Sequence, residues 1–486
     1  MTRTSVVPVV LRSLRVLGVG AVAALAITSS ASATTAGKRR SPFAYLSASR
    51  IALPSGDYRA AALARRIPSF SRQTKLACNV CHYAFPQLTP FGRMFKLNGY
   101  TLTGLQTIQA RDSSREELSL APIPPASAMV LTGITHLQRA VPGTQNNTAS
   151  FPEQFSVFLA GEITPTLGAF TQITYAAPDG SIGIDNIDLR FANRTTLAHQ
   201  SLLYGVTLHN NPTVQDVWNT TPAWGYPFAG SSVAPSPSAA TMIDGALAQQ
   251  VVGLGAYGLW NGLIYTEFTA YRSAPQGVAA PYDSTSTNLG RALMPYWRVA
   301  VQKQIGRNYF MVGTYGMTAQ LYPAGVSGLT DRFTDVAFDA QFEHHLDAGS
   351  IVARSTYIHE QQTLDALTAP DVGAAANLDN SLNTFRLNAS YYPAQGRTSF
   401  TLGYFTTTGS ADSLLYAPSP TSGSANGKPN SNGGIAELDF NPWLNTRLGA
   451  QYVMYSKFNG GSAGYDGSGR SASDNNTLYL YLWLAF

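Results

Sequence analysis

The last ten residues of the chain, 477–486 (TLYLYLWLAF), decide the fold class. Their side chains alternate with a period of two, so that one face is aliphatic and ends in phenylalanine while the other face is aromatic. This alternation is typical of a β-strand whose two faces meet different surroundings, and an aliphatic face suits lipid. A terminal strand that ends on an aromatic residue is typical of outer-membrane barrels. The segment therefore predicts the last strand of a transmembrane β-barrel.

The same alternation recurs upstream, from about Ser127 onward. In the segments 335–343, 383–391 and 447–455, apolar residues alternate with polar ones. Segments of about ten residues are long enough for a tilted strand to cross a membrane. The alternation predicts an all-β region over residues 126–486.

The connectors between these segments alternate between short and long. The tight turns are expected at 164–166, 193–195, 261–262, 306–308, 345–349, 393–396 and 442–445. The long loops, rich in Gly, Ser, Pro and Asn, are expected near 140–153, 178–183, 210–248, 273–291, 322–331, 361–381, 409–431 and 457–474. Seven turns and eight loops join about sixteen antiparallel strands, and an even number of strands is what an outer-membrane barrel requires. A soluble β-sandwich would explain the alternation, but not the regular loop lengths or the terminal phenylalanine.

The N-terminus and the composition agree with an exported membrane protein. Residues 1–33 match a signal peptide: three arginines precede an apolar stretch at 16–27, and Ala31-Ser32-Ala33 matches a cleavage site. Removing these arginines lowers the formal net charge from +5 to +2, so we expect no nucleic-acid partner. Charged residues make up 12% of the chain, against about 25% in ordinary soluble domains. After the signal peptide the sequence contains no run of about 18 apolar residues, so we expect no transmembrane helix.

Both cysteines lie in one motif, Cys78-Asn79-Val80-Cys81-His82. C-x-x-C-H is the attachment pattern of c-type haem. Two thiols three residues apart can each add to one vinyl group of the porphyrin, and the following imidazole can coordinate the iron. The alternative is a disulfide or redox pair with an accidental histidine, which an exported protein permits. The adjacent His82 favours one covalent haem, with Cys78, Cys81 and His82 as its attachment and proximal ligand.

The surrounding residues, 34–125, predict a small and mainly helical monohaem cytochrome module. Short helices are expected at 58–67 and 91–97, the second ending at Asn98-Gly99. The apolar side chains expected to shield the haem are Phe85, Leu88, Phe91, Phe95 and Tyr100. The candidates for the sixth iron ligand are Met94, Met129 and His136. Because both ends of a sixteen-stranded barrel lie on its short-turn side, the module enters from the periplasm and could plug the lumen.

A signal peptide, one C-x-x-C-H module and a sixteen-stranded barrel together resemble the cytochrome–porin fusion family of iron-oxidising bacteria. The most specific stretches are 77–100 (ACNVCHYAFPQLTPFGRMFKLNGY) and 210–228 (NNPTVQDVWNTTPAWGYPF). The resemblance implies an outer-membrane monohaem cytochrome c of a Gram-negative bacterium, with loops facing the exterior. It also implies that the protein oxidises extracellular Fe(II) and passes electrons to a periplasmic soluble cytochrome c or blue-copper protein. The alternatives are a diffusion porin with a haem-bearing plug and an outward conduit that reduces external acceptors.

Two further expectations concern the iron. Fe(II) prefers oxygen and nitrogen ligands, so carboxylates in the loops and lumen are candidate attractors, although a solvated role is the simpler expectation for each. They are Asp216, Asp244, Glu162, Glu267, Glu343, Glu437 and Asp439. Loops built from neutral hydrogen-bonding residues predict an acid-tolerant protein that works at an external pH of about 2–4, where carboxylates become protonated.

Overall fold

The computed structural model describes residues 68–102, 108–112, 115–120, 125–144, 146–176, 180–273, 289–323, 327–394 and 397–486. The predicted signal peptide and the helix expected at 58–67 lie outside these residues. None of the helices among the described residues is long and apolar enough to cross a membrane.

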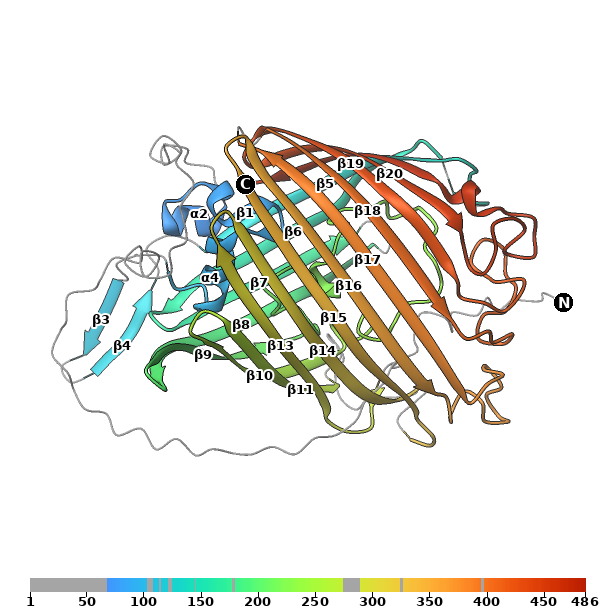
Figure 1. Ribbon diagram of the computed structural model, residues 1–486, viewed down its shortest axis with the longest axis horizontal. Helices are drawn as coiled ribbons and strands as arrows, with labels where there is room; N and C mark the ends of the chain where they lie inside the picture. The colour runs from blue at the N-terminus through green and yellow to red at the C-terminus, as the bar shows by residue number, and fades with distance from the viewer. Residues whose placement is uncertain are drawn as a thin grey trace.

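The described chain forms a closed antiparallel barrel of sixteen long strands, as the sequence predicts (Figure 1). The strands are β5 (Ala126–Leu137), β6 (Ala149–Thr164), β7 (Leu167–Ala176), β8 (Ser181–Leu197), β9 (Gln200–His209), β10 (Val251–Trp260), β11 (Ile264–Ser273), β13 (Met294–Ile305), β14 (Asn308–Tyr322), β15 (Asp331–Leu346), β16 (Gly349–Thr363), β17 (Asp379–Pro393), β18 (Thr398–Gly409), β19 (Ser431–Trp443), β20 (Thr446–Lys457) and β21 (Thr477–Ala485). The two-residue strand β12 (Leu289–Gly290) precedes β13 and pairs with β14. Pairing of β21 with β5 closes the barrel, and Ala485 lies opposite Met129 at this seam.

The barrel is apolar outside and polar inside. On β15, Phe338 is 57% exposed, whereas Asp339 and Glu343 are 4% and 0% exposed. The closing strand follows the same rule, since Leu480 points outward and Tyr479 is fully buried. A closed barrel with an apolar outer face and a polar lumen is the architecture of an outer-membrane protein, because every strand edge is paired and lipid meets only apolar side chains.

Six of the seven predicted tight turns lie at or next to the ends of strands, and one prediction is wrong. Strand β8 continues through the expected turn at 193–195, where Asn193 pairs with Tyr204. The chain reverses at Ala198 and His199, which both have positive φ angles (51° and 61°). A two-residue hairpin needs this geometry, and Asn-Gly or Asp-Gly is its usual sequence signal. The Ala-His pair carries no such signal.

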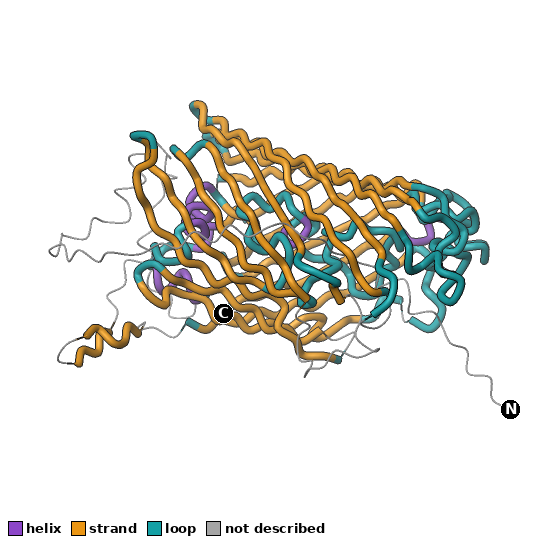
Figure 2. The backbone as a smooth tube through the Cα atoms, turned by 90° about the horizontal axis from the view of Figure 1, so that it is seen from below, coloured by secondary structure: helices purple, strands orange, loops and turns teal. Residues whose placement is uncertain are grey.

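The segment before the barrel folds inside the short-turn end of the lumen (Figures 1 and 2). It contains α2 (Ser69–Thr74), α3 (Cys78–Cys81), the hairpin β1 (His82–Ala84) and β2 (Gln87–Leu88), and α4 (Pro90–Leu97). Helix α4 matches the helix expected at 91–97, and Thr89 caps it by accepting a hydrogen bond from the Gly92 amide. We call residues 68–102 the plug segment. A second hairpin follows the plug segment and consists of β3 (Ile108–Asp112) and β4 (Arg115–Leu120). The prediction of a mainly helical module did not include this hairpin.

Barrel side chains hold the plug segment from several directions. The Ser69 hydroxyl donates to the Ala160 carbonyl at 2.7 Å. The Tyr100 hydroxyl donates to Asp188 at 2.6 Å. The Tyr257 hydroxyl donates to the Leu97 carbonyl at 2.8 Å. These contacts come from β6, β8 and β10. On other strands, Glu343 of β15 accepts from Tyr83, and Arg447 of β20 donates to the Phe85 carbonyl, so the plug segment is held from around the barrel wall.

The longest loop, residues 210–250, folds into the lumen instead of facing the exterior as the sequence predicted. Its Val214, Val217 and Trp218 are at most 1% exposed. Lys96 of α4 donates to the Val214 and Asp216 carbonyls at 2.6 and 2.9 Å. The inward loop therefore packs directly on the plug segment.

Candidate haem site

The C-x-x-C-H motif occupies one turn of helix and the start of a strand. Helix α3 contains both cysteines, and His82 begins β1. The Thr89 amide donates to the Cys81 carbonyl at 2.9 Å, which ties α3 to the start of α4. A Cβ atom on Gly92 would lie 2.1 Å from the Cys81 carbonyl oxygen. Only glycine at this position lets α4 pack so closely against the motif.

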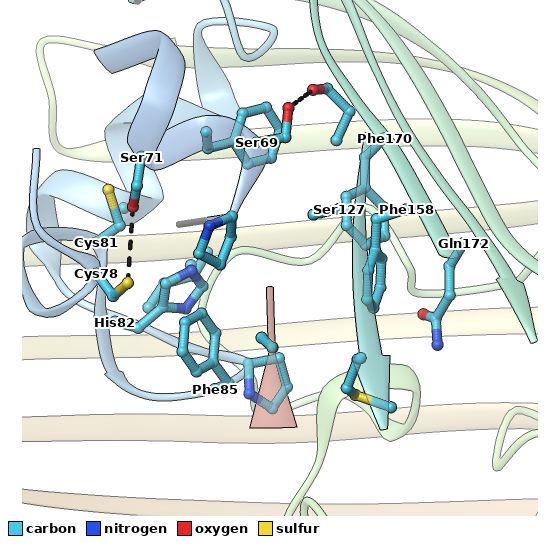
Figure 3. Close-up of a pocket in the computed structure, with 18 of the residues that line it drawn as sticks. Ser69, Ser71, Cys78, Cys81, His82, Phe85, Ser127, Phe158, Phe170 and Gln172 are labelled. Carbon is cyan, nitrogen blue, oxygen red and sulfur yellow. Dashed lines mark hydrogen bonds between the residues drawn. The ribbon is translucent and has the colours of Figure 1, made fainter. Parts of the chain in front are cut away.

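The motif lines a cavity of about 290 Å³ inside the barrel. Figure 3 shows Cys78, Cys81, His82 and Phe85 on one side of this cavity. The opposite wall belongs to the barrel and carries Ser127, Phe158, Phe170 and Gln172. Met129 and Trp483 of the barrel also line the cavity, and Trp483 stacks on Phe85 with 4.7 Å between the ring centroids. The walls are mostly apolar and aromatic, which is the kind of lining that cofactor sites have.

The imidazole of His82 is buried against Phe85, with 4.4 Å between the ring centroids. Its Nδ1 atom is buried and has no hydrogen-bond partner within the described residues. Burial lowers the pKa of His82 to about 4, and backbone groups of Pro86 and Gln87 oppose this only in part. The ring is therefore neutral at neutral pH, the state in which imidazole coordinates iron.

The two cysteines are free thiols in the structure. The Cys78 sulfur lies 3.6 Å from the Ser71 hydroxyl. Burial raises the pKa of Cys78, and burial together with the neighbouring Cys78 raises the pKa of Cys81 to about 12. The thiols of redox-active pairs have lowered pKa values, so this environment does not resemble the redox alternative.

The three candidates for the sixth ligand occupy different places. Met129 of β5 is buried and lines the cavity, and its sulfur accepts a hydrogen bond from the Trp483 ring nitrogen at 2.7 Å. Met94 of α4 packs instead against the cluster that contains Leu97 and Tyr257. His136 is exposed and bonds Asn147 at 2.7 Å. The fold therefore brings Met129 to the same cavity as His82 and leaves the other two elsewhere.

The predicted shielding residues are only part of the cavity wall. Phe85, Leu88, Phe95 and Tyr100 line it, whereas Phe91 is buried next to it in the plug segment. Sequence reasoning missed the aromatic residues that the barrel and the inward loop supply. They are Phe158, Phe170, Trp224, Phe228 and Trp483. For Phe158, Phe170 and Trp483 the signal was an inward-facing position near the short-turn end of a strand, whereas Trp224 and Phe228 of the inward loop carried no such signal.

The carboxylates expected to attract iron are already bound by, or buried among, other groups of the protein. Glu343 accepts from Tyr83 and forms a buried ion pair with Arg93. Asp216 lies 3.7 Å from Arg298 and also lines the cavity at the C-x-x-C-H motif. The others bond as follows: Asp244 with Arg386, Glu267 with Gln215 and Tyr265, Glu437 with Gln451, and Asp439 with Ser399 and Tyr481, while Glu162 is buried. These side chains hold the lumen together, which corrects the expectation of solvated carboxylates.

The fold is similar to those of several solved outer-membrane proteins. The daunomycin complex of OmpF from Salmonella typhi matches at 11% identity and a TM-score of 0.44, over 74% of this chain and 97% of that chain. The outer-membrane channel DcaP of Acinetobacter baumannii matches at 13% identity and a TM-score of 0.43, over 74% and 96%. OmpT of Vibrio cholerae, folded in vitro, matches at 11% identity and a TM-score of 0.39, over 74% and 96%. No protein-family model and no curated protein sequence matches the chain.

Proposed function

We propose that this protein is an outer-membrane monohaem cytochrome c that oxidises extracellular Fe(II) and passes the electrons to a periplasmic carrier. The observation that carries the proposal is the placement of the C-x-x-C-H motif. Both thiols and a buried imidazole with an unpartnered nitrogen line one apolar cavity inside a membrane barrel. These are the groups that attach and ligate c-type haem.

The residues present fit such a cofactor in three respects. Cys78 and Cys81 are thiols available for addition to two vinyl groups, and His82 is neutral. Met129 offers a thioether in the cavity lining, where it accepts a hydrogen bond from Trp483. The mostly apolar and aromatic lining is of the kind that cofactor sites have. Haem supplies one-electron redox chemistry when bound, and Met/His ligation gives a high potential, which suits ferrous iron as the donor.

The position of the cavity also suits transfer across the membrane. It is lined by the plug segment, which lies at the short-turn end of the barrel (Figure 1), and by Met129 and Trp483 of the first and last strands. In an outer-membrane barrel the short turns face the periplasm. A soluble cytochrome c or a blue-copper protein could approach the cavity from that side, while iron stays on the loop side.

A diffusion porin is the second candidate, because the barrel by itself is sufficient for that function. The lumen contents speak against free diffusion. Trp218 of the inward loop, Leu97 of the plug segment and Tyr265 of the wall belong to one packed cluster, and each is at most 1% exposed. Reconstituted protein should therefore conduct poorly, and a large, steady single-channel conductance would favour the porin.

The direct test adds Fe(II) to the oxidised, purified protein at pH 3 and follows the haem absorption bands. We expect rapid reduction in the wild type and none in His82→Ala. The matched control is Met94→Leu, which lies outside the cavity and should be reduced like the wild type. An intact spectrum that responds to dithionite but not to Fe(II) would reject iron oxidation and favour another donor or the outward direction.

A further inference from the structure

The inward-facing Arg354 of β16 has no counter-ion among the described residues. Its side chain is buried, and neither Nε nor Nη2 makes a hydrogen bond there. Its remaining contacts are a long bond of 3.5 Å from Nη1 to the Asn219 carbonyl and stacking over Phe228 at 5.1 Å. By contrast, Arg190 and Arg298 are equally buried and each pairs with a carboxylate.

The polar groups beside Arg354 include further donors without partners. Asn388 of β17 lies directly opposite Arg354 in the sheet, and its buried Nδ2 makes no hydrogen bond to any described residue. The Tyr226 hydroxyl is also buried, has no partner in the described part of the chain, and lies in electrostatic range of Arg354. Its ring packs over Gly403, the cross-strand neighbour of Asn388. Three elements therefore bring unsatisfied donors to one place.

Among the described residues, the carboxylates in electrostatic range of Arg354 are Glu343 and Asp216, and neither forms an ion pair with it. Asp216 faces Arg298 instead. On the other side of Arg354, the Oε1 atom of Gln341 is an unpartnered acceptor, which can satisfy a donor but not a charge. Glu343 is already bound by Arg93 and Tyr83. Glu437, in electrostatic range of Tyr226, is bound by Gln451. An isolated charge in a protein interior is strongly unfavourable unless a partner neutralises it.

We propose that Arg354, Asn388 and Tyr226 form an anion site in the lumen, which takes a carboxylate or a small oxyanion. The entry is the cavity at the C-x-x-C-H motif, because Asn219 and Phe228 line that cavity and both contact Arg354. A guanidinium with two free donors binds a planar carboxylate or an oxyanion through paired hydrogen bonds. Two sources share this chemistry: a propionate of the haem, which rests on the proposed function, and a free anion such as sulfate, which does not.

The experiment compares purified full-length wild type, Arg354→Gln and Asn388→Leu in detergent. Equilibrium dialysis with radiolabelled sulfate measures the free-anion source. We expect the wild type to bind about one sulfate per chain. The affinity for sulfate should fall about tenfold or more in both variants, because Arg354→Gln loses a charge-assisted donor and Asn388→Leu loses a neutral one. Arg307→Gln is the control, because it removes a guanidinium whose ion pair with Asp347 is exposed. It should bind sulfate like the wild type.

Resonance Raman spectra of the propionate modes and the haem midpoint potential measure the other source. A wild type that binds no sulfate but shows both signals shifted in Arg354→Gln, and not in Arg307→Gln, identifies a propionate as the anion. Unchanged sulfate binding and unchanged haem signals in both Arg354→Gln and Asn388→Leu would overturn the site. If Arg354→Gln does not fold, Asn388→Leu decides, since it retains the charge. A wild type without covalent haem would refute the proposed function and leave the sulfate measurement to decide this site.

Discussion

The lumen contains two layers of different character, the cavity beside the plug segment and the inward loop that fills the lumen next to it. The first is a candidate binding site, and the second closes the channel. At the cavity, the plug segment faces the barrel wall across an open space of about 290 Å³ with apolar walls. Next to it, the inward loop is bound through buried charges: Arg298 contacts both Asp216 of the loop and Asp339 of β15. Thr220 of the loop also donates to Asp339. The same barrel thus encloses an open cavity at the proposed cofactor site and a packed, charged layer where the inward loop crosses the lumen.

The largest expected effect tests the cavity layer. Replacing both Cys78 and Cys81 by serine should abolish covalent haem, because the thioether bonds need the sulfur atoms. Mass spectrometry of the denatured chain measures the loss against a wild type that retains one haem. Ser71→Ala is the control, since it removes only the hydroxyl that lies 3.6 Å from the Cys78 sulfur. Haem that remains attached to the double variant would contradict the site.

The next effect tests the charged layer. Arg298→Met leaves Asp339 and Asp216 buried without their cation, and breaking a buried pair in this way costs about 3–5 kcal/mol. We expect a lower urea midpoint of unfolding and higher conductance in planar bilayers. Arg307→Met is the control, because its ion pair with Asp347 is exposed. Should both variants behave alike, the charged layer would have no special role in sealing the lumen.

A third prediction concerns Lys96, which joins the two layers. Burial and the nearby Arg190 lower its pKa from 10.5 to about 7. The unfolded chain therefore binds more protons than the folded one between these pH values, so the free energy of unfolding rises with pH from about 7 to 10.5. Lys96→Met should flatten this rise in urea titrations. A slope that is the same in both proteins would show that Lys96 stays charged in the lumen.

The smallest expected change in stability comes from Met129→Leu. The two side chains have similar volumes, so the cost should stay below about 1.5 kcal/mol. If Met129 ligates the iron, its loss should lower the midpoint potential, because thioether ligation raises it. Met94→Leu should leave the potential unchanged. Equal potentials in all three proteins would exclude Met129 as the ligand.

The contrast between the layers also explains what could be predicted from the sequence. Lipid imposes alternation on each strand separately, so segments such as 335–343 identified strands and their inward faces without knowledge of their neighbours. The C-x-x-C-H motif was equally local. The inward path of the loop was not, since Asp216 and Thr220 meet partners on β13 and β15 that lie about 80 to 120 residues away. The aromatic wall opposite the motif depends on barrel closure, which no local pattern encodes.

The seam between the first and last strands has a consequence for biogenesis. Met129 and Leu131 of β5, and Trp483 and Ala485 of β21, all line the cavity, and these strands pair with each other. The cavity therefore lacks the part of its wall that Trp483 and Ala485 supply until β21 has docked against β5. Before that step the C-x-x-C-H motif is present without this part of its enclosure. Closure of the cavity thus depends on closure of the barrel.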